Sequence, residues 1–237
     1  MSMERIYPDN IQTDEITGSE TLQLHLERYH YAGRHLQPGN VADVACGAGY
    51  GSYLLATAYG DKIQQIIAAD IDETSIAYAA KRYAHAKIRF VTADAVHFDP
   101  GVVLNNIVSL ETIEHLNDPA LFIKHISTYL AAGGRFIASA PVTPSMDANP
   151  YHLHDFTISS FKKMFLEAGM KEIDSFIQVQ RYHPLPLIQR KEKRSEDLRK
   201  NVLRFYLDHP GKFFSRLSSI VRDGFANKYA VVIFEKL

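Results

Sequence analysis

The sequence "VADVACGAGYGSYLLA", residues 41–56, combines an apolar run, a glycine-rich turn and the start of a helical pattern. The run predicts a strand that ends at Val44, and a helix is predicted to begin near Tyr50. Gly47 and Gly49 can adopt backbone angles that other residues avoid, and they let a ligand approach the main chain. Free N–H groups at the helix start favour a carboxylate or phosphate. A purely structural tight turn would contain the same glycines, so neighbouring residues must distinguish a ligand-binding loop from a structural turn.

Two acidic residues at the ends of the next predicted strands favour a ligand site. Asp70 closes the predicted strand 62–70, about 20 residues after the glycines, where a carboxylate can bind ribose hydroxyls. Asp94 closes the predicted strand 87–94, in a position to meet an adenine amino group. Either aspartate alone could be a helix cap or a turn residue. Because each follows the expected strand, the pair favours a nucleotide-like ligand.

Short β-rich runs alternate with helical segments along the chain, which predicts an α/β fold with a mostly parallel sheet. Gly133 and Gly134 are expected to stop a helix. The predicted strands are 40–45, 62–70, 87–94, 102–110, 135–141, 171–180 and 228–237, and the predicted helices of the core are 50–60, 72–86, 118–131 and 157–170.

With these features the chain resembles the class I S-adenosylmethionine-dependent methyltransferases, over about 40 to 180 and the final strand. The pattern D-x-A-C-G-x-G-x-G differs from the G-x-G-x-x-G of nicotinamide enzymes. The resemblance implies a Rossmann-like seven-stranded sheet, mostly parallel with an antiparallel last strand and with helices on both faces.

The same resemblance assigns cofactor contacts residue by residue. It places Asp43 and the loop Ala45, Cys46, Gly47 and Gly49 at the methionine part, Asp70 at the ribose, Ile71, Asp94 and Ala95 at the adenine, and Ser109 and Leu110 beside the sulfonium. Residues 1–39 are expected to form a helical cap region. From "HLERYHYAG" (25–33), His25, Arg28 or Tyr29 could touch the cofactor carboxylate or the substrate. An amphipathic packing helix is the alternative.

Two polar clusters should meet at the carboxyl edge of this sheet. "SLETIEHL" (109–116) supplies Glu111, Glu114 and His115 after the fourth strand, and "NPYHLHDFT" (149–157) supplies His152 after the fifth. A hydroxyl acceptor needs a general base, or a metal that lowers its pKa. The four residues are therefore candidates for catalysis, and as a set they would suit Mg²⁺ or Mn²⁺. The alternative is that E-x-x-E-H works without a metal. Tyr151 and His154 are candidate substrate contacts.

Two narrower resemblances suggest different acceptors. E-x-x-E-H with a later histidine is similar to the small-RNA 3′-terminal 2′-O-methyltransferases, which hold a divalent metal. "H-x-x-R-Y", "CGAGYGS", "ETIEH" and "NPYH" together resemble bacterial methyltransferases associated with sugar, polysaccharide or natural-product biosynthesis. The second match covers more of the chain. We therefore expect O-methylation of a small molecule or glycan, with an RNA 2′-O-methyltransferase and a non-catalytic nucleotide-binding module as alternatives.

The composition is ordinary for a globular protein: 237 residues, 46% hydrophobic, 22% charged and a net charge of −1. The charge argues against broad nucleic-acid binding, no apolar run approaches the roughly 18 residues of a membrane span, and a single cysteine without a leader-like start suggests the cytoplasm. Arg181 to Lys228 nevertheless carries +7, against −8 for the remainder. We expect residues 181–227 to be a basic helical insertion before the last strand. It could be a solvated cover, a homodimer interface or an attractor of an anionic acceptor.

Overall fold

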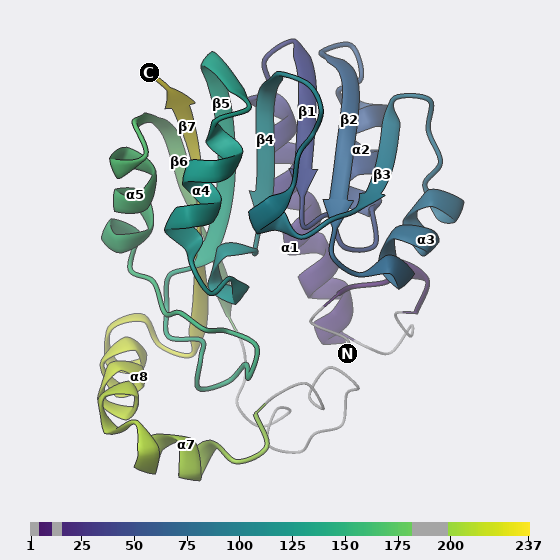
Figure 1. The fold of residues 1–237 in the computed structure, drawn as a ribbon. Coiled ribbons are helices and arrows are strands. Elements are labelled where there is room, and N and C mark those ends of the chain that lie inside the picture. The colour runs from purple at the N-terminus through teal and green to yellow at the C-terminus, as the bar shows by residue number, and fades with distance from the viewer. Residues whose placement is uncertain (1–4, 11–15, 182–198) are drawn as a thin grey trace.

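The computed structural model describes residues 5–10, 16–181 and 199–237, which form one sheet with helices on both faces (Figure 1). The strands are β1 (Gly39–Val44), β2 (Ile63–Asp70), β3 (Ile88–Thr92), β4 (Leu104–Leu110), β5 (Leu130–Pro141), β6 (Met170–Arg181) and β7 (Ala226–Lys236). The α-helices are α1 (Ile16–Arg34), α2 (Tyr50–Ala58), α3 (Glu73–Arg82), α4 (Pro119–Ser127), α5 (Ile158–Glu167), α7 (Val202–Asp208) and α8 (Pro210–Asp223). Short 3₁₀ turns are η1 (Pro8–Asn10), η2 (Ala95–His97) and η3 (Ile113–His115).

The seven strands lie in the order β3-β2-β1-β4-β5-β7-β6. Neighbours from β3 to β5 are parallel, and β7 runs antiparallel to both β5 and β6. The predicted seven-stranded sheet with an antiparallel last strand is therefore confirmed. The order reverses direction between β1 and β4, so the carboxyl ends of these strands flank a crevice where ligands bind in such sheets.

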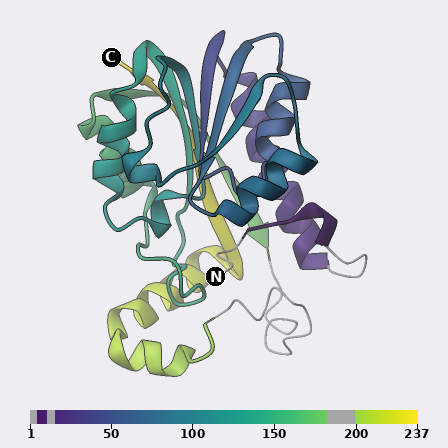
Figure 2. The same ribbon diagram turned by 45° about the vertical axis from the view of Figure 1, so that its right-hand side comes forward.

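Each face of the sheet is covered by its own apolar core. On one face, α4 and α5 pack Phe122, Phe161 and Phe165 against the sheet. On the other, Tyr29 of α1, Leu55 of α2 and Ile76 of α3 belong to a second cluster. The turned view in Figure 2 shows the sheet between these two layers, with α7 and α8 at the lower end of the molecule. Among the described residues, no helix is long and apolar enough to cross a membrane.

Local sequence signals fix several helix starts. Asp72 accepts a hydrogen bond from the Ser75 N–H at the start of α3, and Asp118 accepts one from the Leu121 N–H at the start of α4. Thr157 and Ser160 form a reciprocal capping box at the start of α5. These caps satisfy N–H groups that a helix start leaves without an intrahelical partner.

The predicted end of the helix at 118–131 was wrong. We expected a helix over 118–131 stopped by Gly133 and Gly134, but α4 ends at Ser127 and both glycines lie inside β5. Leu130, which is 2% exposed, belongs to the core under the sheet. Gly133 has φ 72° at an irregular stretch of the β4–β5 register. Burial of Leu130 thus extends the strand across a glycine pair that ordinarily ends a helix.

The basic insertion contains two described helices, α7 and α8, and residues 182–198 of it lie outside the described part of the chain. The strand after it begins at Ala226, two residues before the predicted start. The division of the chain into a core and this insertion stays a prediction.

Candidate functional site

A cavity of about 450 Å³ opens at the carboxyl ends of β1, β2 and β4. Its lining includes the glycine loop after β1, the ends of β2 and β4, helix α1 and the segment after β5. Of the residues predicted to hold the cofactor, those that line it are Ala45, Cys46, Gly47, Asp70, Ile71, Asp94, Ala95 and Leu110. The structure therefore brings most of the predicted cofactor set to one cavity.

The glycine loop adopts the backbone that its sequence allows. Gly47 and Gly49 have φ angles of 55° and 83°, in the left-handed region that favours glycine. A Cβ on Gly49 would lie 2.6 Å from the Ala79 side chain and 2.8 Å from the ring of Phe90, so this glycine also permits close packing. Gly49 itself does not line the cavity but is the N-cap residue of helix α2.

Asp70 ends β2 and binds three groups. Its carboxylate accepts hydrogen bonds from the N–H groups of Gly47 and Asp72, both at 2.9 Å. It also accepts one from the Arg5 guanidinium at 2.6 Å. The N–H contact of Gly47 fixes the loop against the end of β2, while Arg5 brings the N-terminal segment to the position where the resemblance implies a ribose.

Asp43 lies beneath the cavity rather than in its wall. Its side chain is fully buried and accepts hydrogen bonds from the hydroxyls of Ser52, at 2.5 Å, and Tyr29, at 3.2 Å. Burial raises the pKa of Asp43 to about 7, and the nearby charge of Asp70 adds to the increase. Tyr29 lines the cavity, so Asp43 acts on the site by holding this ring and the start of α2. Because Asp43 is buried beneath the cavity wall, the structure does not favour the direct cofactor contact predicted for this residue.

At the end of β4, Ser109 is fully buried and does not line the cavity, whereas Leu110 does. The two residues alternate across the strand, so only one of them can face the ligand. After β3, the Asp94 carboxylate accepts a hydrogen bond from the Val96 N–H at 3.0 Å. This contact orients Asp94 at the cavity edge.

Arg28 and Glu111 form a separate polar pair. Arg28 is 2% exposed; its Nε donates to the Gln178 side chain at 2.7 Å, and its guanidinium lies 4.3 Å above the ring of Tyr229. Its Nη1 is 3.5 Å from Glu111 Oε1, which also accepts the Ser139 hydroxyl at 2.7 Å. Both Arg28 and Glu111 line the cavity.

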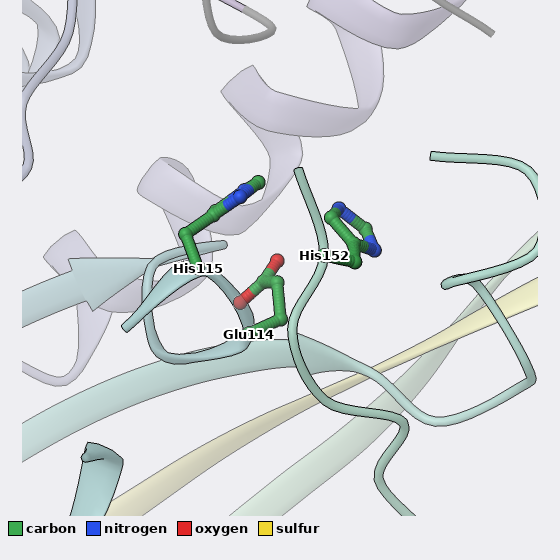
Figure 3. Close-up of side chains that lie close together, drawn as sticks. All are labelled: Glu114, His115 and His152. Carbon is green, nitrogen blue, oxygen red and sulfur yellow. The ribbon is translucent and has the colours of Figure 1, made fainter. Parts of the chain in front are cut away.

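Glu114, His115 and His152 form a compact cluster, shown in Figure 3. One candidate ligand atom from each residue lies within 4.8 Å of the others, and the two imidazole rings are 4.7 Å apart. Glu114 and His115 come from η3, and the Leu153 N–H donates to the Glu114 carbonyl at 2.7 Å, which ties the loop carrying His152 to η3. His115 and His152 line the cavity, whereas the fully buried Glu114 lies behind them.

The predicted four-residue set is thus reduced to three. Glu111 has φ 53° at the end of β4, and this turn directs its carboxylate to Arg28 and Ser139. The i, i+3 spacing of Glu111 and Glu114 would place them on one face of a helix, but the helical turn begins only at Ile113. The Glu111 carboxylate therefore lies outside the three-residue cluster.

Two further predicted contacts are absent from the cavity lining. The backbone carbonyl of Tyr151 accepts a hydrogen bond from His115 Nδ1–H at 3.2 Å, but Tyr151 is not part of the cavity wall. His154 lies 2.8 Å from the Leu116 carbonyl through Nε2 and stacks on Phe156. Both residues shape the loop around His152.

Sequence reasoning missed several wall residues because they come from distant elements. The N-terminal segment, β6, β7, α8 and the loop after β5 contribute Arg5, Thr143, Asn149, Gln180, Arg216, Asn227 and Tyr229. Only Asn149 had a usable signal, since it begins the quoted "NPYH". The others reach the cavity through sheet order and the return of α8, which no local pattern encodes.

Several known proteins similar to this chain are named as methyltransferases. Residues 42–138 match the family described as a methyltransferase domain. A probable S-adenosylmethionine-dependent methyltransferase of Mycobacterium tuberculosis is 27% identical over 175 residues, which cover 67% of this chain and 62% of that protein. The chain thus spans less than two thirds of this relative's length.

Solved structures show the same fold. A candidate methyltransferase of Bacillus halodurans aligns with a TM-score of 0.67 and 18% identity, over 89% of this chain and 98% of that one. The N-methyltransferase NodS of Bradyrhizobium japonicum, solved with S-adenosylhomocysteine, aligns with a TM-score of 0.61 and 12% identity, over 99% and 93%. The expected fold is confirmed, and the matched domain and the relative agree with the resemblance to S-adenosylmethionine-dependent methyltransferases.

Proposed function

We infer that this chain, which carries a methyltransferase domain on the class I S-adenosylmethionine-dependent fold, methylates a hydroxyl oxygen of a small polar acceptor such as a sugar. The observation that carries the proposal is the cavity. The glycine loop, Asp70 and Asp94 line one end of this cavity. His115 and His152 also line it, so a cofactor and an acceptor group could meet in the same space.

The residues of the first end fit S-adenosylmethionine. A Cβ added to Gly47 would meet nothing within 4 Å, so the loop leaves open space for a ligand against its backbone. Asp70 offers a carboxylate to ribose hydroxyls, and Ile71, 55% exposed, offers an apolar surface to the adenine. When bound, the cofactor supplies an electrophilic methyl group. In-line alignment of the acceptor then supplies much of the rate.

His152 is our choice of general base. It is 8% exposed, and its Nδ1 lies 2.7 Å from the Ser145 hydroxyl. Asp155 accepts a hydrogen bond from the Ser145 N–H at 2.7 Å, so the partner of His152 is itself held in place. With the proton on Nδ1 and donated to Ser145 Oγ, the lone pair on Nε2 is the base that a hydroxyl acceptor needs.

The three-residue cluster also supports a metal-assisted form of the same reaction. One carboxylate and two imidazoles suit Mn²⁺ better than Mg²⁺, which prefers oxygen ligands. Glu114, His115 and His152 would hold the ion, and it would lower the pKa of an acceptor hydroxyl. Glu111 would take no part because it binds Arg28 and Ser139.

The remaining wall favours an acceptor rich in hydroxyl groups. Thr143, Gln180 and Asn227 line the cavity with neutral hydrogen-bonding groups. Asn149 is 6% exposed, and its Nδ2 has no hydrogen-bond partner in the described part of the chain. An acceptor oxygen would satisfy this buried donor.

Calorimetry with S-adenosylhomocysteine tests the cofactor site. We expect binding by the wild type and roughly 10- to 100-fold weaker binding by Asp70→Ala, since charged hydrogen bonds contribute about 1.5–3 kcal/mol. Asp61→Ala, at an exposed turn, is the matched control and should bind like the wild type. A wild-type protein that does not bind would contradict the whole assignment.

Methyl transfer to a panel of nucleotide sugars and free sugars, followed by mass spectrometry, tests the acceptor. His152→Ala should lower the rate about 10²- to 10⁴-fold while binding S-adenosylhomocysteine like the wild type. Labelled RNA retained at moderate salt and methylated would favour the RNA alternative. Cofactor binding without any methylated acceptor would favour the non-catalytic module.

Titration with Mn²⁺, followed by the electron spin resonance of the free ion, tests the metal-assisted form. His115→Ala should weaken binding at least about tenfold, and Glu111→Ala should leave it unchanged. Wild-type activity that is undiminished in EDTA would assign the reaction to His152 without a metal.

A further inference from the structure

Helix α8 turns charged side chains toward the molecule and apolar side chains toward solvent, the reverse of an ordinary surface helix. Toward the molecule it presents Lys212, which donates to Asp155 at 2.7 Å, and Arg216, which forms two hydrogen bonds to Asp147. Ser219, 3% exposed, lies on the same side. A surface helix of a globular protein normally turns its apolar stripe inward and its charges outward.

The outward side of α8 is an apolar stripe. The exposed fractions of Phe214, Leu217 and Val221 are 65%, 48% and 81%, and Phe213 is 45% exposed. At about 100° per residue these four side chains fall within a third of the helix circumference. Contact with water is unfavourable for such a stripe by about 25 cal/mol per Å².

Helix α7 also exposes apolar side chains. Leu203 and Leu207, one helical turn apart, are 74% and 75% exposed. Both helices lie at the lower end of the molecule in Figures 1 and 2, away from the sheet. We call Leu203, Leu207, Phe213, Phe214, Leu217 and Val221 the apolar face. Large exposed apolar surfaces mark binding sites for a protein or a membrane.

Exposed charges beside the apolar face are mainly basic. Lys200 is exposed, and the side chains of Arg204 and Arg222 are 78% and 69% exposed. Two carboxylates offset part of this charge: Asp208, 62% exposed, lies 3.9 Å from Arg204, and Asp223, 5% exposed, pairs with both Arg222 and Lys228. The balance among these five residues is one positive charge, to which Lys200 adds another. Phe and Leu flanked by Lys and Arg are typical of helices that lie in the headgroup region of anionic bilayers.

We propose that the apolar face of α7 and α8 docks this protein onto an anionic lipid membrane. Phe213, Phe214 and Leu217 would enter the acyl boundary, and Arg204 and Arg222 would meet lipid phosphates. A second copy of the chain fits less well, because a twofold contact through this face would set its basic rim against an identical rim.

Docking through this face would bring the cavity close to the membrane. Arg216 lines the cavity from the inner side of the helix whose outer side carries the apolar face. A membrane-bound molecule would therefore hold the cavity close to the bilayer, within reach of an acceptor carried on a lipid. This consequence, unlike the docking itself, rests on the proposed function.

Sedimentation of the purified full chain with lipid vesicles tests the docking. We expect it to pellet with vesicles of phosphatidylcholine mixed with phosphatidylglycerol, less with phosphatidylcholine alone, and less as salt is raised. The double variant Phe214→Ser/Val221→Ser should bind at least about tenfold more weakly, since it removes two apolar side chains from the surface that would enter the bilayer. Val103→Ser/Leu121→Ser removes side chains of 65% and 50% exposure elsewhere and should bind like the wild type.

Reversing the charge of two basic side chains is a second test of membrane docking. Lys200→Glu/Arg204→Glu should abolish the preference for phosphatidylglycerol while leaving the melting temperature unchanged, because both side chains are exposed. Wild-type protein that stays in the supernatant, or equal binding by wild type and Phe214→Ser/Val221→Ser, would overturn the proposal. A dimer in sedimentation velocity that this variant dissociates, without vesicle binding, would assign the apolar face to a second copy.

Discussion

Asp43 is a carboxyl group placed where water cannot reach it. It is fully buried, and burial raises its pKa from 3.8 to about 7 despite hydrogen bonds from Ser52 and Tyr29. The folded protein therefore holds a proton there that the unfolded chain releases once the pH exceeds about 4. The stabilising contribution of this protonated group is fully present below pH 4, and it is lost as the pH rises through about 7.

The variant Asp43→Asn should reveal this linkage. The amide cannot ionise, so the melting temperature of the variant should rise relative to the wild type as the pH increases from about 4 to about 7. Above that range the difference should be constant. Thermal unfolding followed by circular dichroism across this range measures it, with Asp61→Asn as an exposed control. A difference that does not vary with pH would show that Asp43 is ionised throughout.

Helices α1 and α2 are held together by an unusually close approach at Gly51. A Cβ on this residue would lie 2.0 Å from Cζ of Tyr29, a separation that requires one of the helices to move. Because Tyr29 lines the cavity and donates to Asp43, the glycine positions a wall of the site from inside a helix. The third glycine of "CGAGYG" thus serves packing between helices.

Gly51→Ala should destabilise the fold although alanine is the better helix former. Propensity would favour the variant by about 1 kcal/mol, but overpacking costs about 1–3 kcal/mol, and displacement of Tyr29 should also weaken S-adenosylhomocysteine binding. Gly211→Ala in α8 is the matched control, since its Cβ would meet nothing within 4 Å. It should be neutral or stabilising. Urea unfolding compares the two, and equal effects would contradict the close approach.

The insertion and the loop after β5 are joined by two ion pairs. Arg216 binds Asp147 at 2.6 Å and Lys212 binds Asp155 at 2.7 Å. Burial by itself would raise the pKa of Asp147, but Arg216 and the Tyr206 hydroxyl bring it below its usual value. A carboxyl group with a lowered pKa stabilises the fold at neutral pH, and this contribution is lost as the pH falls through the folded-state pKa, below about 4.

Asp147→Asn should lower the stability by about 3 kcal/mol at neutral pH, because it leaves Arg216 largely buried without a counter-charge. For a chain of this size that corresponds to a melting temperature roughly 6–12 °C lower. The gap between variant and wild type should narrow below about pH 4. Asp208→Asn removes an exposed pair with Arg204, 3.9 Å apart, and should change stability by less than about 0.5 kcal/mol. Similar losses for both variants would contradict the role of the buried pair.

Local sequence was sufficient for the sheet and for the end of the cavity formed by the glycine loop, Asp70 and Asp94. Strands β1, β2 and β4 and the turn between β1 and α2 follow from apolar runs and glycines that act on their nearest neighbours. In parallel strands the carboxyl ends meet at one edge, so Gly47, Asp70 and Asp94 could be placed together before any coordinates were known.

Only the tertiary structure separated Glu111 from Glu114, His115 and His152, and only it brought Arg216 of α8 to the cavity. The positive φ of Glu111 is stabilised by Arg28 and Ser139, which lie 83 and 28 positions away in the chain. The same holds for the reversed faces of α8, whose charges turn inward because Asp147 and Asp155 are there to receive them. Patterns of neighbouring residues encode elements, whereas contacts between distant residues determine which side chains share a site.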